Sequence, residues 1–164
     1  MVRSRPESVL NEKWADFIQG GVAIMVSSRD SRNLPTLARG VGCRVTANRQ
    51  KVTLLMGAPQ AQDLMNAVRL TGVVAAVFSQ PSTHISVQLK GNDATLAPGR
   101  AADVQIAKRH EDAFVAETNP LGYPEDLIRA LLSSDAADLM AITFTPIAAF
   151  LQTPGPRAGE SLSS

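Results

Sequence analysis

The sequence predicts one mostly antiparallel α+β domain over residues 1–152, with the strands in a sheet or closed into a barrel and with helices attached. Short apolar runs bounded by turn residues alternate along the chain with segments of helical spacing. The gaps between most of these runs are too short for the crossovers that parallel strands need. A length of 164 residues, with 45% hydrophobic and 19% charged residues, fits a single domain with a sizeable core.

Four segments carry apolar residues at the spacing of an amphipathic helix. They cover residues 4–18, 59–68, 99–117 and 124–132. The first segment opens on Ser4, followed by Pro6 and Glu7, which is a capping-box start. In the second, Pro59 stands where the first turn of a helix tolerates proline.

Six segments read as strands. They cover residues 22–26, 36–46, 52–56, 72–78, 83–90 and 140–144. Residues 83–90 show the clearest alternation, with one apolar and one polar face. Residues 72–78 are apolar on both faces, which is typical of a strand covered by a helix or by a second subunit. We favour the subunit interface and therefore expect a homodimer.

Composition excludes several kinds of partner and site. The net charge of +1 leaves no excess of cations for a nucleic-acid backbone, so no nucleic-acid partner is expected. Cys43 is the only cysteine, which excludes an internal disulfide and favours a reducing compartment. The first eleven residues resemble no signal peptide, and no apolar run is long enough to span a membrane, so we expect a cytoplasmic protein without a membrane anchor.

The last residues, 153–164, are rich in proline, glycine and serine. Such a segment offers too little apolar surface to hold itself in a core. The sequence therefore predicts a flexible C-terminal tail unless a partner orders it.

Several familiar motifs are incomplete in this sequence. Gly40 and Gly42 form only the first half of a dinucleotide-binding fingerprint. His110 and Glu111 lack the second histidine of a zinc-binding helix, and His84 is the only other histidine. We expect no metal site.

The segment 36–46 combines small residues with arginines. Ala38, Gly40 and Gly42 leave one strand face nearly bare, so either a flat ligand lies on it or a helix or a partner's backbone packs there. Arg39 and Arg44 would point to opposite sides in a regular strand, and a bulge at Gly40 or Gly42 would re-aim one of them. Arginine suits a phosphate because its planar fork donates paired hydrogen bonds, although each arginine could equally be solvated or ion-paired.

A second polar group follows the segment 83–90. His84, Ser86, Gln88 and Lys90 would share one strand face at two-residue spacing. Such a row could contact the polar edge of a flavin ring or could be an ordinary solvent-facing surface. His84 could also be a proton donor, although a lone histidine is more often structural.

The stretches LPTLARGVGCRV, KVTLLM, VVAAVFSQPSTHISVQLKG and ITFTPIAAFLQTPGP resemble the FMN-binding split-barrel proteins related to pyridoxamine phosphate oxidase. The resemblance covers roughly residues 17–156. It implies a six-stranded split β-barrel with peripheral helices, which packs as a homodimer and holds FMN in a groove at the interface.

The resemblance also implies which residues contact the cofactor. They are Arg39, Gly40, Val41, Gly42 and Arg44 on the strand near the phosphate, and Ser86, Gln88 and Lys90 beside the ring. Where the oxidases carry a Ser-Arg-Lys phosphate cradle after the third strand, this sequence has Ala58-Pro59-Gln60-Ala61. Arg157 stands alone where those oxidases have a basic C-terminal segment for the substrate's phosphate, so we do not expect a pyridoxamine phosphate oxidase.

Three kinds of function follow from the resemblance. The first is an FMN-dependent oxidoreductase of unknown substrate, or its variant with a deazaflavin in place of FMN. The second is a non-catalytic homodimer that binds a flavin or another small ligand and has a degenerate phosphate site. The third is a dimer whose pocket has degenerated, which would be colourless and keep its interface. Fold alone does not separate them, because function depends on the site.

Overall fold

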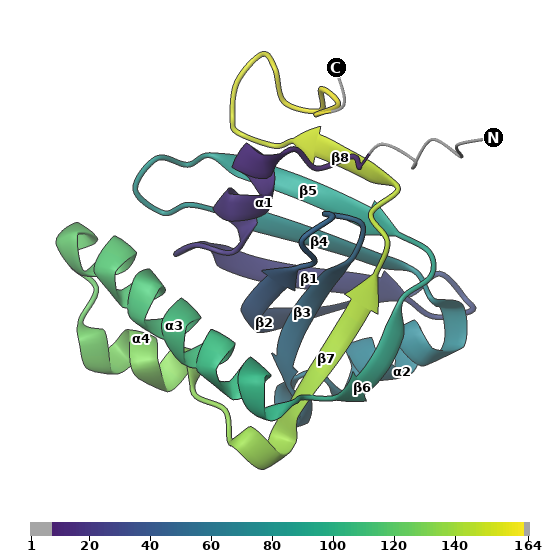
Figure 1. Ribbon diagram of the computed structural model, residues 1–164, viewed down its shortest axis with the longest axis horizontal. Coiled ribbons are helices and arrows are strands. Elements are labelled where there is room, and N and C mark those ends of the chain that lie inside the picture. The colour runs from purple at the N-terminus through teal and green to yellow at the C-terminus, as the bar shows by residue number, and fades with distance from the viewer. Residues whose placement is uncertain (1–7, 163–164) are drawn as a thin grey trace.

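The computed structural model describes residues 8–162, which form four α-helices and eight β-strands (Figure 1). The helices are α1 (Glu12–Ile18), α2 (Gln62–Thr71), α3 (Ala101–Thr118) and α4 (Glu125–Leu132). The strands are β1 (Ala23–Arg29), β2 (Pro35–Val45), β3 (Val52–Gly57), β4 (Val74–Ser79), β5 (Ser86–Gly91), β6 (Thr95–Pro98), β7 (Leu139–Phe144) and β8 (Ala148–Leu151). Three short 3-10 turns accompany them: η1 (Ala58–Gln60), η2 (Asn119–Leu121) and η3 (Ala136–Asp138).

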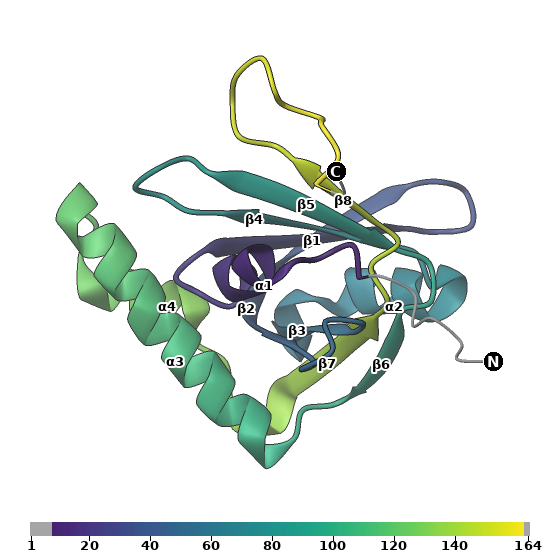
Figure 2. The ribbon, with the colours of Figure 1, turned by 45° about the horizontal axis from the view of Figure 1, so that its top comes forward.

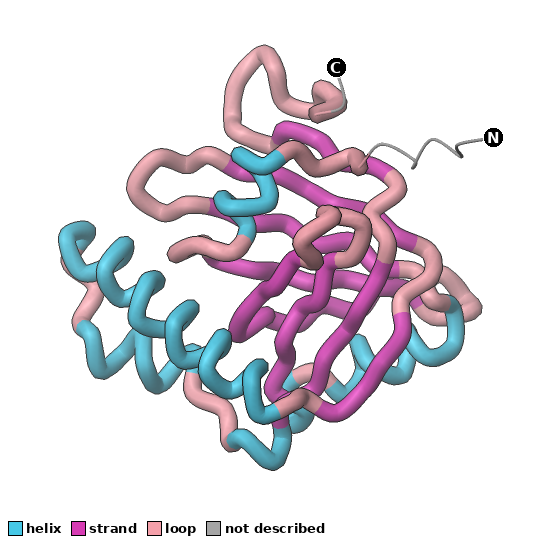
Figure 3. Tube along the Cα trace, in the orientation of Figure 1, coloured by secondary structure: helices cyan, strands magenta, loops and turns pink. Residues whose placement is uncertain are grey.

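All eight strands belong to one sheet, in the order β6-β7-β3-β2-β1-β4-β5-β8, and each neighbouring pair is antiparallel. The strands are drawn in magenta in Figure 3. The prediction of a mostly antiparallel α+β domain is confirmed. The predicted count of six strands is wrong, because β6 and β8 were missed, and within residues 8–162 the sheet does not close into a ring. Each missed strand has only four residues, too few for alternation to show.

The sheet folds over on itself, and the main core lies between its two halves. Figure 2 shows β1, β4 and β5 in one layer and β3, β6 and β7 in another. Large fully buried side chains come from both layers: Ile24, Phe78 and Leu89 from the first, and Leu54, Ile142 and Phe144 from the second. Each such side chain contributes roughly 1.5–3 kcal/mol of burial free energy.

Helices α2, α3 and α4 match the predicted segments within a few residues. The first helix begins later than predicted, at Glu12, because Asn11 caps it: the Oδ1 of Asn11 accepts a hydrogen bond of 3.0 Å from the backbone N–H of Trp14. The predicted capping box at Ser4 lies outside the described residues. No helix within residues 8–162 has both the length and the apolar character needed to span a bilayer.

Residues 153–162 turn back along β8 (Figure 1). The backbone N–H of Leu151 donates to the carbonyl of Glu160, and the N–H of Leu162 donates to the carbonyl of Ala149. The side chain of Leu162 packs against the main core. A single apolar residue near the chain end therefore anchors the segment, while its flexibility stays a prediction.

Candidate functional site

Strand β2 contains a bulge at its glycines, which the sequence had left as a possibility, and the bulge determines where the two arginines lie. The pairing of β2 with β3 shifts register between Gly40 and Gly42, so Val41 is the extra residue. Arg39 pairs with Met25 of β1, on the side of the sheet that faces away from the main core. Arg44, beyond the bulge, also lies on the side away from that core but beneath α3.

Arg44 forms an ion pair with Asp103 of α3. The distance from Nε of Arg44 to Oδ1 of Asp103 is 2.7 Å, and the side chain of Asp103 is fully buried. Asp103 also accepts hydrogen bonds from the backbone N–H and the Nε of Arg100, at 3.0 and 3.4 Å. Burial alone would raise the pKa of Asp103, but these hydrogen bonds and the arginine charges lower it on balance. The sequence left Arg44 either as a phosphate ligand or as a solvated or ion-paired residue. The structure shows it ion-paired with Asp103, and its role in phosphate binding stays a prediction.

Helix α3 covers the glycine-rich part of β2. A Cβ placed on Gly42 would lie 3.4 Å from the backbone of Ala107 in α3, and one on Gly40 would lie 2.7 Å from the side chain of Ile24. Val41 is buried in a small cluster with Leu55 that packs against α3. Helix α3 therefore covers Gly42, and the side chain of Ile24 in β1 covers Gly40. Protein atoms occupy the space above these glycines, where the alternative interpretation was a flat ligand.

The residues predicted on β5 are split between the strand and the loop before it. Gln88 and Lys90 lie on the side away from the core, with Lys90 Nζ 5.3 Å from the ring centre of Phe150 in β8. Ser86 is buried, and its hydroxyl forms a 2.8 Å hydrogen bond with that of Ser79. His84 precedes the strand in a turn, with φ at 60°, so the expected four-residue row is wrong at His84.

The outer sides of β1, β4, β5 and β8, with the first half of β2, form a surface that we call the open face. The strand registers place five side chains in one row across it: Arg39, Met25, Val77, Gln88 and Phe150. None of these residues belongs to a buried cluster. In Figure 2 no helix covers the side of β4 and β5 that faces away from α1 and α2. Within residues 8–162, Arg39 and Gln88 make no side-chain hydrogen bond or ion pair.

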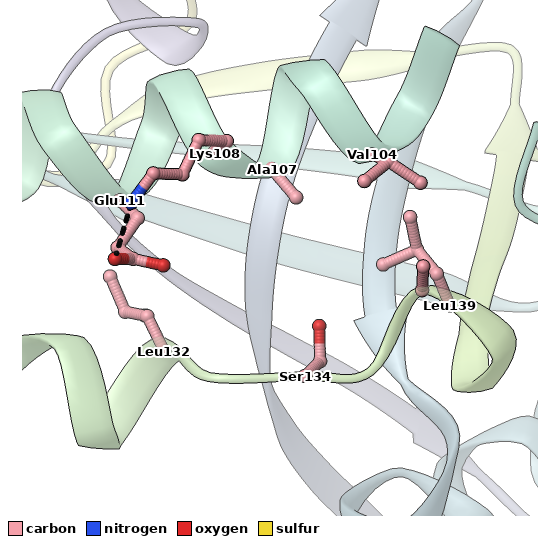
Figure 4. A pocket seen from close by; sticks show the side chains of 8 residues that line it. Val104, Ala107, Lys108, Glu111, Leu132, Ser134 and Leu139 are labelled. Atoms are coloured by element: carbon pink, nitrogen blue, oxygen red, sulfur yellow. Dashed lines mark hydrogen bonds and ion pairs between the residues drawn. The ribbon is translucent and has the colours of Figure 1, made fainter. Parts of the chain in front are cut away.

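Two cavities lie along α3, and sequence reasoning predicted neither. The smaller, of about 130 Å³, lies between α3 and the segment that joins α4 to β7 (Figure 4). Its walls include Val104, Ala107 and Leu139, and the hydroxyl of Ser134 points into it. The larger, of about 420 Å³, lies between β2, the end of α1 and α3. Its lining joins residues that are far apart in sequence, so no local pattern could have revealed it.

The turn after β3 does not fit a phosphate group. Turn η1 and the segment between α4 and β7 line a cavity of about 240 Å³ that holds Gln60, Asp135 and Asp138 and no cation. Two carboxylates at this place repel a phosphate, whose binding requires cationic or N–H donors. The open face, with Arg39, Gln88 and Lys90 beside apolar side chains, fits a flat ring that bears polar atoms on its edge. Within the described residues, no group of three histidine, cysteine or acidic side chains forms a metal site.

Comparisons with known proteins identify the fold. No family model and no curated protein matches the sequence. The crystal structure of HupZ from Group A Streptococcus is similar, with a TM-score of 0.56, 11% identity and coverage of 92% of this chain and 99% of HupZ. An F420 reductase has a TM-score of 0.57 and 13% identity, with 85% of this chain and 98% of the reductase covered. A candidate pyridoxamine 5'-phosphate oxidase from Lactobacillus delbrueckii has a TM-score of 0.51 and 9% identity, with 86% and 93% covered. This chain thus has the fold shared by F420 reductase and the proteins related to pyridoxamine phosphate oxidase, as its sequence resemblance predicted.

Proposed function

We propose that the chain is a homodimeric oxidoreductase that binds a flavin or a deazaflavin on the open face, where the second subunit completes the site. The fold supports the cofactor class, because its structural neighbours include an F420 reductase and a candidate pyridoxamine 5'-phosphate oxidase. The open face supports the location. Within residues 8–162, Arg39 and Gln88 on this face make no side-chain hydrogen bond or ion pair, and Leu37 is exposed.

The observation that carries the proposal is the row across the open face. Met25 and Val77 form an apolar floor between the cationic Arg39 and the amide of Gln88. A flat conjugated ring needs this combination: an apolar surface under its plane and hydrogen-bond donors at its edge. The exposed side chain of Leu37, 65% accessible, extends the same surface toward a second subunit.

Arg39 and Gln88 of the row, together with Lys90 two residues further along β5, have distinct roles in this proposal. Arg39 and Lys90 provide positive charge, which stabilises negative charge on the ring system. Gln88 donates or accepts a hydrogen bond at the ring edge and so fixes its orientation. The second subunit excludes water from the other side of the ring. A flavin or deazaflavin supplies the hydride transfer when it is bound.

A second candidate function is a homodimer that binds a flavin or small ligand without turnover. The acidic cavity beside η1 favours it, because Asp135 and Asp138 stand where a phosphate cradle would need cations. In both candidates FMN should bind no more than about threefold tighter than riboflavin, since the phosphate gains no charge-assisted hydrogen bond there. Oxidation of NADH or NADPH by the loaded protein supports the oxidoreductase, and its absence supports the non-catalytic dimer.

The visible absorption spectrum tests the proposed function. We expect the protein to retain FMN, riboflavin or F420 after the free compound is removed. Arg39→Ala should weaken retention about tenfold or more, the loss of one charge-assisted hydrogen bond. Arg69→Ala serves as the control, because Arg69 lies on α2 and bonds only to Asn66 within the described residues. A wild-type protein that retains none of the three compounds contradicts the proposal.

A further inference from the structure

The smaller cavity along α3 is mostly apolar and lies apart from the open face (Figure 4). One of its walls belongs to α3, and the other to the end of α4 and the segment before β7. The α3 residues have i, i+3, i+4, i+7 spacing, which places them on one face of the helix. They are Val104, Ala107, Lys108 and Glu111, and the opposite wall consists of Leu132, Ser134, Ala136 and Leu139.

The cavity lies where two small apolar clusters face each other. Leu139 belongs to the cluster against which Val104 and Ala107 of α3 pack. Leu132 belongs to the separate cluster between α3 and α4. Both leucines are buried, so closely packed side chains fix the shape of the cavity. A ligand would therefore meet a site that is already formed.

The charged groups of the lining are paired with each other and with α4. The Oε1 of Glu111 lies 3.1 Å from the Nζ of Lys108 and 2.6 Å from the Nη1 of Arg129. Burial alone would raise the pKa of Glu111, but its hydrogen bonds to Arg129 and Lys108 lower it on balance. Because each charge already has a partner of opposite sign, the cavity favours an uncharged ligand.

Ser134 supplies the polar group that a ligand can use. Its hydroxyl points into the cavity (Figure 4). Of the three polar side chains in the lining, only that of Ser134 lacks a hydrogen bond within residues 8–162. A hydroxyl donates one hydrogen bond and accepts others, so it suits a ligand with a single donor or acceptor.

Size and polarity limit the ligand further. The volume of about 130 Å³ is close to that of an apolar cavity of about 150 Å³, which holds one benzene molecule. A buried water needs about three hydrogen bonds to be well ordered, whereas this lining offers one free side-chain hydroxyl beside apolar walls. Water held by so few partners is readily displaced by an apolar ring.

We propose that this cavity binds a small uncharged ring compound with one hydroxyl group, of the size of phenol. The ligand's hydroxyl forms a hydrogen bond with that of Ser134, and its ring contacts Val104, Leu132 and Leu139. The site shares no residue with the row on the open face, so its occupation does not depend on flavin binding.

Phenol and toluene are matched probes for this site, because they have nearly the same shape and differ by a hydroxyl in place of a methyl group. The methyl signals of Leu132 and Leu139 in NMR spectra report on the cavity, and those of Leu89 in the main core are the internal control. We expect phenol to shift the first set saturably, with a dissociation constant of about 1 mM or tighter, and to leave the signals of Leu89 unchanged.

Ser134→Ala tests the hydrogen bond. We expect its affinity for phenol to fall about fivefold, the usual effect of losing one neutral hydrogen bond, while its affinity for toluene does not fall. Ser133→Ala is the matched control, because Ser133 is the preceding residue and lines the neighbouring cavity beside η1 instead. It should bind both probes as wild type does.

Ala107→Leu tests the location. The side chain of Ala107 points into the cavity (Figure 4), so a leucine there fills the space, and affinity for both probes should fall about tenfold or more. Unchanged methyl signals of Leu89 show that the variant is folded. The proposal is overturned if phenol causes no saturable shift in wild type, if Ser134→Ala binds phenol as tightly as wild type, or if Ala107→Leu binds both probes undiminished.

Discussion

Asp103 is a fully buried carboxylate whose charge is balanced by Arg44 and Arg100. Replacing Arg44 by alanine removes the shorter of its two ion pairs and leaves the carboxylate buried. We expect the free energy of unfolding at pH 7 to fall by about 1.5–3 kcal/mol, the usual size of a hydrogen bond to a charged group. Urea denaturation measures the change. Arg32→Ala, which removes an exposed ion pair with Asp30, is the control and should change stability by less than about 0.5 kcal/mol. Equal losses in the two variants contradict the assigned role.

His110 makes stability depend on pH between 7 and 5. Its pKa is about 4 in the folded chain, against 6.5 for a free histidine, because burial disfavours the charged ring. In this window the unfolded chain takes up a proton at this position and the folded chain does not, so stability falls as the pH falls. We expect a loss of about 2 kcal/mol between pH 7 and pH 5, measured by denaturation at both values.

The carboxylates with lowered pKa values, Asp93 among them, lose their stabilisation only below about pH 5, outside this window. His110→Gln removes the titrating ring and should abolish most of the difference between pH 7 and pH 5. The control His84→Asn should keep it, because His84 is exposed and asparagine tolerates its positive φ. An unchanged pH dependence in His110→Gln contradicts the prediction.

At the scale of single residues, the sequence indicated which residue types could form a site, but it did not indicate which residues they contact. Arg39 and Arg44 were identified together, but their surroundings differ: one lies on the open face and the other contacts Asp103, which is 59 residues away in the chain. The cavity along α3 was missed for the same reason. Its residues come from three elements, and only the packing of α3 against β2 brings them together.

At the scale of elements, Gly40 shows how tightly β2 lies against its neighbours. A Cβ at this position would come within 2.7 Å of Ile24, whose side chain is fully buried and has little room to move. We expect Gly40→Ala to lower the free energy of unfolding by about 1–3 kcal/mol, the usual effect of overpacking a core. Gly20→Ala is the control, since the nearest atom to its Cβ is 3.4 Å away. Thermal unfolding of both variants measures the effect, and we expect a lower melting temperature for Gly40→Ala than for Gly20→Ala. Equal melting temperatures in the two variants contradict the prediction.

The elements themselves were largely predictable. Helices α2, α3 and α4 and six of the strands follow from apolar spacing, because periodicity records which face of an element is buried. The glycines of β2 raised the possibility of a bulge, and the structure has one between Gly40 and Gly42. The start of α1 and the strands β6 and β8 were missed, because capping by Asn11 and pairing at the sheet ends depend on a few residues each. Such short elements are stabilised by tertiary contacts more than by their own pattern.

At the scale of the whole molecule, a single chain leaves one side of its sheet partly apolar. Leu37 is 65% exposed and lies on the same side of β2 as Arg39, next to the row that contains Met25 and Val77. Exposed apolar surface of this kind, with polar groups around it, is typical of an interaction site. The resemblance predicted a homodimer, and the open face is where we propose that it forms.

Val77→Lys tests the dimer on this face. Val77 lies on β4 with its side chain on the open face, so a lysine there leaves the core unchanged but places a charge in the proposed interface. In sedimentation velocity at micromolar concentration, we expect wild type to be a dimer and Val77→Lys a monomer with unchanged far-UV circular dichroism. Ala116→Lys, a similar change at an exposed position of α3, should remain a dimer. A monomeric wild type refutes the dimer. A dimer in both variants means that the subunits meet on another surface, and the cofactor site completed by a second subunit would have to be sought there.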